Sequence, residues 1–297
     1  MNIFIAGGTG AIGVPLVRAL VGAGHSVTAL TRHQSKTHQL LALGATPAVA
    51  DALDRNGLIA ALEGARPTHV VHQLTALPKD GPRRARDIES TNRLRIDGTR
   101  NLLEASINAG ARRFVVGSFA PLAHVDESDP AVEAVSSMET QVLDASKRGA
   151  IEGVVLRYGM FYGLEAASTV AMIEMVRKRM LPVVRGDVSR LPVIHLDDAV
   201  SATIRALDAA PAGAVYDIVD DRPVSLAEIV RGLAEYTGSK PPLTVPAWLP
   251  RLVAPYLVRV TSLQLSLSNV KARQDLGWRP RYPTLREGLA QMFQRAA

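Results

Sequence analysis

The 297-residue sequence contains no cysteine, and this absence limits its chemistry at once. Disulfide bonds, thiolate metal ligands and cysteine nucleophiles are all excluded. The seven histidines do not fall at metal-ligand spacings, because His69 and His72 are separated by two valines that indicate a strand. We therefore expect no metal site.

Long apolar runs and clustered aromatic residues are also missing. No run of about 18 apolar residues occurs, and residues 1–6 have neither the basic start nor the cleavage region of a signal peptide. We therefore expect a cytoplasmic protein without a membrane partner. The net charge is +6, but no aromatic residues interleave with the densest arginine run, residues 83–86, so we expect a small-molecule substrate and no nucleic acid.

Strand-like and helix-like segments alternate along the first two-thirds of the sequence. Residues 2–6 are an apolar run stopped by glycine, residues 11–23 have apolar residues at helical spacing, and residues 26–30 resemble a second strand. These three segments have the size of one βαβ unit, and the alternation continues to residue 219. The pattern predicts an α/β fold, a Rossmann-type doubly wound parallel sheet.

The last part of the sequence has a different pattern, in which helical pieces are interrupted by prolines. We predict a small, mainly helical C-terminal substrate lobe beside the nucleotide-binding domain. The predicted bounds are 1–163 with 191–219 for the domain and 164–190 with 220–297 for the lobe. The apolar segment 248–260 fits a packing face of the lobe better than a membrane-surface helix, because Pro250 and Pro255 interrupt it.

A glycine-rich turn joins the first strand to the first helix. Gly7 permits the tight turn, Gly10 lets the backbone approach a pyrophosphate, and Gly13 lets the helix pack closely on the strand. The helix N-terminus adds free N–H groups and the positive end of a dipole. We predict a dinucleotide site with contacts from Gly7, Thr9, Gly10, Ala11, Ile12 and Gly13.

The end of the second strand lacks the acidic residue that would bond the ribose 2′-hydroxyl of NAD. Residues 31–36 contain no Asp or Glu. Arg32 can form a bidentate pair with the 2′-phosphate of NADP, and Lys36 adds a second positive charge. The alternative is a surface arginine on a basic protein, but the pattern favours NADP over NAD.

Several motifs follow one another in a characteristic order. They are GGTGAIG at 7–13, DALD at 51–54, GTRNLLEA at 98–105, LRYGMFYG at 156–163, IHLDDA at 194–199, and GWRP at 277–280 with LREGL at 285–289. Together they resemble the NAD-dependent epimerase/dehydratase family, the extended and atypical short-chain dehydrogenases/reductases. The resemblance covers the whole chain. It implies adenine contacts from Asp51, Ala52 and Leu53, contacts to the ribose and nicotinamide from Leu74, Thr75 and Ala76, and Ser118 in place of the catalytic serine or threonine.

The family's catalytic pair, Tyr-x-x-x-Lys on one helix face, is absent. The family motif ends with a glutamate four residues after the lysine, so anchoring on Glu139 places Val135 at the lysine and Ala131 at the tyrosine. Neither residue can transfer a proton. The resemblance also places Arg95 where the family has asparagine, three residues before the helix glycine.

A literal Tyr-x-x-x-Lys occurs at Tyr236 and Lys240, but a glycine between them ends that helix, so the two side chains would not share a face. We predict instead that Tyr158, after the sixth strand, replaces the missing acid and contacts the cofactor. Tyr162 and His195 are weaker alternatives. A packing tyrosine with a bonded hydroxyl is the competing interpretation of Tyr158.

Two classes of function remain open. One is an NADP(H)-dependent oxidoreductase that acts on a small carbonyl or alcohol compound, and the other is a non-catalytic NADP(H)-binding sensor or scaffold. Ser118 and the apolar lobe favour the enzyme, while the missing pair favours the sensor. A sugar-nucleotide epimerase or dehydratase is disfavoured, because it needs the tyrosine. The resemblance also implies that a homodimer can form.

Overall fold

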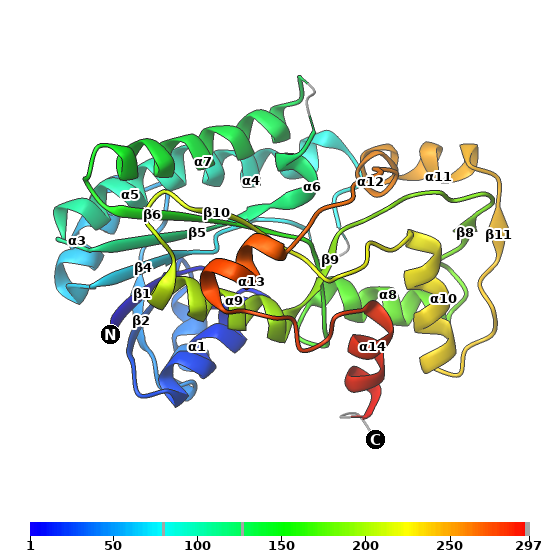
Figure 1. Cartoon of the computed structure of the whole chain (residues 1–297), viewed down its shortest axis with the longest axis horizontal. Helices are drawn as coiled ribbons and strands as arrows, with labels where there is room; N and C mark the ends of the chain where they lie inside the picture. The colour runs from blue at the N-terminus through cyan, green and yellow to red at the C-terminus, as the bar shows by residue number, and fades with distance from the viewer. Residues whose placement is uncertain (79–80, 126–127, 295–297) are drawn as a thin grey trace.

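A seven-stranded, fully parallel sheet forms the centre of the protein (Figure 1). The computed structural model describes residues 1–78, 81–125 and 128–294. The strand order is β10-β6-β5-β4-β1-β2-β3. The strands are β1 (Asn2–Ala6), β2 (Ser26–Thr31), β3 (Thr46–Val49), β4 (His69–His72), β5 (Arg113–Phe119), β6 (Glu152–Tyr158) and β10 (Val215–Ile218). The predicted α/β class and doubly wound sheet are confirmed.

Helices cover both faces of the sheet (Figure 1). Successive residues of β1 point to opposite faces, so Ile3 and Ile5 join one apolar cluster, and Phe4 and Ala6 join the other. The first cluster is closed by α1 (Gly13–Gly22), α2 (Thr37–Ala42) and α9 (Leu196–Ala209), and the second by α3 (Arg55–Ala65), α5 (Thr99–Asn108) and α7 (Pro130–Lys147). Each fully buried leucine, isoleucine or phenylalanine contributes about 1.5–3 kcal/mol, so these two layers hold the sheet rigid.

A smaller layer lies beyond the end of β6 (Figure 1). It contains α8 (Ala167–Arg177), α10 (Leu226–Tyr236) and α14 (Leu285–Gln294), which bury a separate apolar cluster that includes Ile173, Val230 and Leu289. Two short parallel pairs accompany these helices: β7 (Met160–Tyr162) with β9 (Val193–His195), and β8 (Val183–Val184) with β11 (Thr244–Val245).

One segment assigned to the lobe from sequence contributes to the core of the sheet domain. Helix α13 (Val270–Leu276) packs on α9 and β10, and Ala272, Leu276 and Trp278 belong to the same apolar cluster as α1. The rest of the two-part division stays a prediction. The last three residues of the predicted lobe, 295–297, lie outside the described residues.

The apolar segment 248–260 forms two helices, α11 (Trp248–Val253) and α12 (Pro255–Thr261), which meet at Ala254. The break agrees with the prolines. The expected packing face is found only in α12, which buries Tyr256. In α11, Trp248 is 60% exposed and Leu252 is 74% exposed, so this half of the prediction is wrong.

The long helix expected over 88–109 is a series of helical turns rather than one regular helix. It consists of η2 (Ala85–Ile88), α4 (Glu89–Arg93), the π-helical turn η3 (Leu94–Gly98) and α5. Two further short elements, η1 (Gln34–Lys36) and α6 (Ala120–Ala123), follow β2 and β5. Among the helices in the described ranges, none combines the length and the apolar content needed to cross a membrane.

Candidate active site

The glycine turn between β1 and α1 has the geometry that the sequence predicts. Gly7 has a φ of +97°, which favours glycine, and the Gly10 N–H donates to the Gly7 carbonyl at 3.0 Å. A Cβ added at Gly13 would lie 2.0 Å from the Gly7 carbonyl oxygen, so no larger residue fits there. The tight turn expected at Gly7 is present, and Gly13 packs against the backbone of that turn. The resulting cradle fits a diphosphate, because a helix N-terminus opens from it.

The cradle lies at the point where the strand order reverses. Strand β1 stands between β2 and β4, and a Cβ at Gly7 would approach the Gln73 carbonyl oxygen, just after β4, to 2.6 Å. Parallel sheets bind ligands at such a switch point, outside the carboxyl ends of the strands. The predicted contacts Leu74, Thr75 and Ala76 follow β4 at this edge.

Two other predicted groups of contacts lie at the ends of neighbouring strands. Asp51, Ala52 and Leu53 follow β3, where the Asp51 carboxylate accepts the Leu53 N–H at 2.9 Å. Arg32 and Lys36 follow β2 and are exposed. Within the part of the chain that the structure describes, neither has a carboxylate partner. Arg32 Nε donates to His33 Nε2 at 3.0 Å.

Ser118 lies near the end of β5, and its hydroxyl donates to Glu139 Oε1 at 2.5 Å. Glu139 comes from α7 and is 6% exposed. The Arg157 guanidinium, from β6, donates to the same carboxylate, with Nη2 2.6 Å from Oε2. This hydrogen bond to Glu139 raises the pKa of Arg157. Glu139 thus joins α7 to β5 and β6, and the Ser118 hydroxyl proton is used in the hydrogen bond to this carboxylate.

The two positions at which the sequence predicts the family's catalytic pair are filled by apolar side chains. Ala131 and Val135 lie on the buried face of α7, one turn apart, and both are at most 1% exposed. They pack in one apolar cluster with Ile88, Leu122 and Tyr256. Tyr256 comes from α12, so the C-terminal part of the chain covers this position.

Tyr158, the predicted substitute acid, is 2% exposed. Its hydroxyl lies 2.7 Å from Thr203 Oγ1 and accepts a hydrogen bond from Gln73 Nε2 at 3.1 Å. The Thr203 hydroxyl donates to the Ala199 carbonyl, so the Tyr158 proton is directed to Thr203. Burial raises the pKa of Tyr158 to about 12. These contacts suit a packing role, and the acid role stays a prediction.

Tyr162 and His195, the weaker candidates, are also held within the fold. The Tyr162 hydroxyl donates to Asp220 at 2.8 Å, and its ring stands edge-on to His195. His195 Nδ1 accepts the Asp197 N–H at 3.1 Å and so caps α9. Burial raises the pKa of Asp220, which sequence reasoning did not identify.

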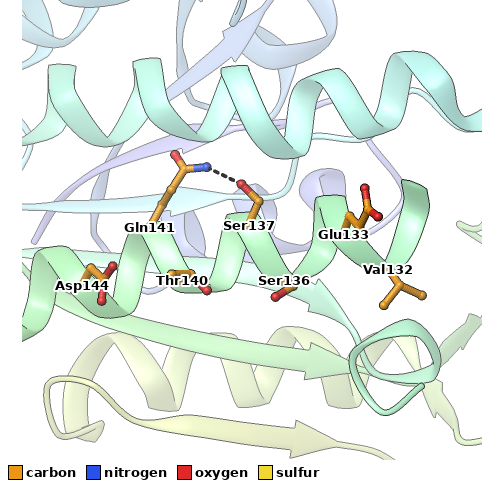
Figure 2. Close-up of a pocket in the computed structure, with 7 residues that line it drawn as sticks. All are labelled: Val132, Glu133, Ser136, Ser137, Thr140, Gln141 and Asp144. Carbon is orange, nitrogen blue, oxygen red and sulfur yellow. Dashed lines mark hydrogen bonds between the residues drawn. The ribbon is translucent and has the colours of Figure 1, made fainter. Parts of the chain in front are cut away.

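A surface hollow lies elsewhere. It has a volume of about 510 Å³ and follows the solvent-facing side of α7 (Figure 2). Its lining residues are Val132, Glu133, Ser136, Ser137, Thr140, Gln141 and Asp144. Glu139 points to the opposite, buried side of the same helix, so this hollow is separate from the switch point.

Across the described ranges, no three His, Asp or Glu side chains gather as metal ligands would.

Comparisons with known proteins agree with this geometry. The profile of the NAD dependent epimerase/dehydratase family matches residues 3–219. A Streptomyces protein named 3-diazoavenalumate denitrifying reductase is 37% identical, covering 97% of this chain and 99% of its own. A Stigmatella aurantiaca protein named 4-hydroxy-2-methyl-3-oxo-4-farnesyl-3,4-dihydroquinoline-1-oxide ketoreductase is 28% identical, covering 99% and 96%. The structure of Thermus thermophilus UDP-glucose 4-epimerase with NAD superposes with a TM-score of 0.79 at 23% identity, covering 99% and 98%.

Proposed function

Because this chain belongs to the NAD-dependent epimerase/dehydratase family, we propose that it is an NADP(H)-dependent reductase that delivers hydride to the carbon of a diazonium group. Relatives named as reductases match nearly the whole chain, which supports an oxidoreductase over a non-catalytic sensor. The name of the Streptomyces relative gives it a diazo substrate. The observation that carries the proposal is the apolar pair Ala131 and Val135, where the family's proton-transferring pair is expected.

The chemistry explains why such a site needs no tyrosine. Reduction of a ketone requires a proton at oxygen as well as hydride at carbon, so that reaction uses an acid. Reductive loss of dinitrogen from a diazonium group forms one carbon–hydrogen bond and breaks one carbon–nitrogen bond. The hydride brings one electron pair, dinitrogen leaves with the other, and no proton is consumed. Bound NADPH would supply the hydride.

The chain's own residues have two tasks in this reaction. The backbone of the glycine turn and the N-terminus of α1 would hold the diphosphate, with Arg32 and Lys36 on the 2′-phosphate. The apolar side chains around Ala131 and Val135 would keep water away from the reactive carbon, where water competes with hydride. The preference for NADP rests on Arg32, whereas the Thermus epimerase was solved with NAD.

In the test, the purified enzyme is incubated with arenediazonium salts, some of them carboxylated, and with NADPH that is deuterated at C4. We expect loss of the nicotinamide absorbance, release of dinitrogen in the headspace, and an arene that carries deuterium at the former diazo carbon. A reaction without enzyme corrects for direct reduction by NADPH. A parallel panel of ketones and aldehydes tests the carbonyl alternative. Turnover of carbonyls without turnover of any diazonium salt would contradict the proposal.

A further inference from the structure

Arg95 stands in an unusual backbone segment beside this site. It belongs to the π-helical turn η3, which interrupts the regular helix between α4 and α5. Such turns carry one extra residue and often occur at functional sites. The turn packs on α7, and Arg95 is only 7% exposed.

The guanidinium of Arg95 has no acceptor for its hydrogen bonds within the described residues. Other arginines of low exposure are bonded: Arg113 donates to Glu152 and to the Ala206 and Leu207 carbonyls, and Arg157 donates to Glu139. A guanidinium stays charged in proteins, so burial without a counter-ion is costly. Burial lowers the pKa of Arg95 to about 10. Its nitrogen atoms are not among the buried side-chain atoms without a hydrogen-bond partner, so each of them keeps some exposed surface.

The neighbours of Arg95 place its charge at the candidate site. His72, which ends β4, is buried, and this burial together with the charge of Arg95 lowers the pKa of the imidazole to about 4. Tyr256 is a second neighbour, because the charge of Arg95 opposes the rise in the phenol's pKa that burial causes. Tyr256 packs with Ala131 and Val135. Arg95 therefore lies near the end of β4 and near the tyrosine that packs on the two apolar positions of α7.

We propose that Arg95 binds a carboxylate of the substrate, and that the hydroxyl of Tyr256 faces the same anion. The proposal deepens the proposed function, because it assigns a substrate class to the same site. A carboxylate matches the planar fork of a guanidinium and forms two parallel hydrogen bonds with it. The substrate carboxylate would then be the counter-ion that Arg95 lacks among the described residues. The same carboxylate would orient the reducible group of the substrate toward the cofactor crevice.

The experiment measures binding rather than turnover, so it is independent of the proposed hydride acceptor. The complex of the protein with NADP⁺ is titrated calorimetrically with benzoate, phenylacetate and cinnamate, each paired with its primary amide. We expect at least one carboxylate to bind about 10-fold or more tightly than its amide. In Arg95→Gln this preference should disappear, and in Arg95→Lys it should fall to an intermediate value. The dissociation constant of NADPH should not change in either variant.

Arg100→Gln is the matched control, because Arg100 lies on the adjoining helix α5 but is exposed and paired with Asp97. It should leave the carboxylate preference unchanged. Arg95→Gln should also unfold at an equal or higher temperature, since it removes a buried charge without a partner. Equal binding of acids and amides by the wild-type protein would overturn the proposal. So would loss of NADPH affinity in Arg95→Gln, which would assign the charge to the cofactor.

Discussion

The Ser118 hydroxyl donates to the Glu139 carboxylate across 2.5 Å, and that carboxylate is also the counter-ion of Arg157. One buried acid thus fastens α7 to β5 and β6 at the edge of the candidate site. This arrangement gives Ser118 a structural partner and leaves its proton unavailable to a substrate carbonyl. Val135 and Ala131 stand four and eight residues before Glu139 on the same helix.

Glu139→Gln should destabilise the fold, because it leaves the Arg157 charge without its counter-ion at a site of low exposure. We expect a loss of about 3 kcal/mol in the free energy of unfolding, measured by urea denaturation. Glu104→Gln breaks the exposed Arg55–Glu104 pair and serves as the control, with a much smaller expected change. Equal effects of the two variants would contradict this account of Glu139.

Tyr158→Phe separates the two interpretations of this tyrosine. The hydrogen bonds to Thr203 and Gln73 suggest that turnover will stay within a few-fold of wild type, while the free energy of unfolding falls by about 1 kcal/mol. Steady-state kinetics and urea denaturation measure the two effects. A loss of about 100-fold in kcat with normal cofactor affinity would instead establish Tyr158 as the acid.

Gly13→Ala should abolish cofactor binding, because its Cβ would clash with the Gly7 carbonyl oxygen that shapes the turn. Fluorescence titration with NADPH measures the loss. Gly22→Ala is the matched control at the other end of α1, where a new Cβ has no neighbour within 4 Å. That variant should bind NADPH normally and gain about 0.5–1 kcal/mol of stability. Normal binding by Gly13→Ala would exclude the turn as the diphosphate site.

Local patterns predicted the sheet well, because the period of the apolar residues and the spacing of the glycines can be read from residues that are close together in the sequence. The β1 strand, the turn at Gly7 and the break between α11 and α12 all follow from such signals. The surroundings of Tyr158 could not be predicted, because Gln73 and Thr203 lie 85 and 45 residues away in the chain. The packing of Tyr256 on Ala131 could not be predicted either, because these two residues are also far apart in the sequence. The homodimer and the cytoplasmic location stay predictions.

Arg32→Asp should reverse the cofactor preference. The guanidinium would no longer pair with the 2′-phosphate, and a carboxylate there repels the phosphate but can bond a ribose hydroxyl. We expect the dissociation constant of NADPH to rise about 30-fold or more and that of NADH to stay constant or fall, as measured by fluorescence titration. Lys36→Gln should weaken NADPH binding less, because its ammonium offers only a point charge. A wild-type preference for NADH would show that Arg32 is an ordinary surface arginine.

Stability should fall as the pH drops from about 6.5 to 4, because of His72. Burial, with the charge of Arg95, lowers the pKa of this imidazole to about 4 in the folded protein. Unfolded chains therefore take up a proton in this window while folded ones do not, which favours unfolding by on the order of 3 kcal/mol. The neutral ring also accepts the Leu74 N–H at Nδ1, a bond that protonation would break.

Urea denaturation at several pH values should show a shallower slope between pH 6.5 and 4 for His72→Asn than for wild type, even if the variant is less stable throughout. His38→Asn is the control, because His38 is exposed, and it should keep the wild-type slope. NADPH affinity should weaken over the same window if Leu74 contributes to the cofactor crevice, since its N–H loses the acceptor that orders the segment after β4. Identical slopes in wild type and His72→Asn would show that other groups dominate the acid sensitivity and that His72 is not held neutral.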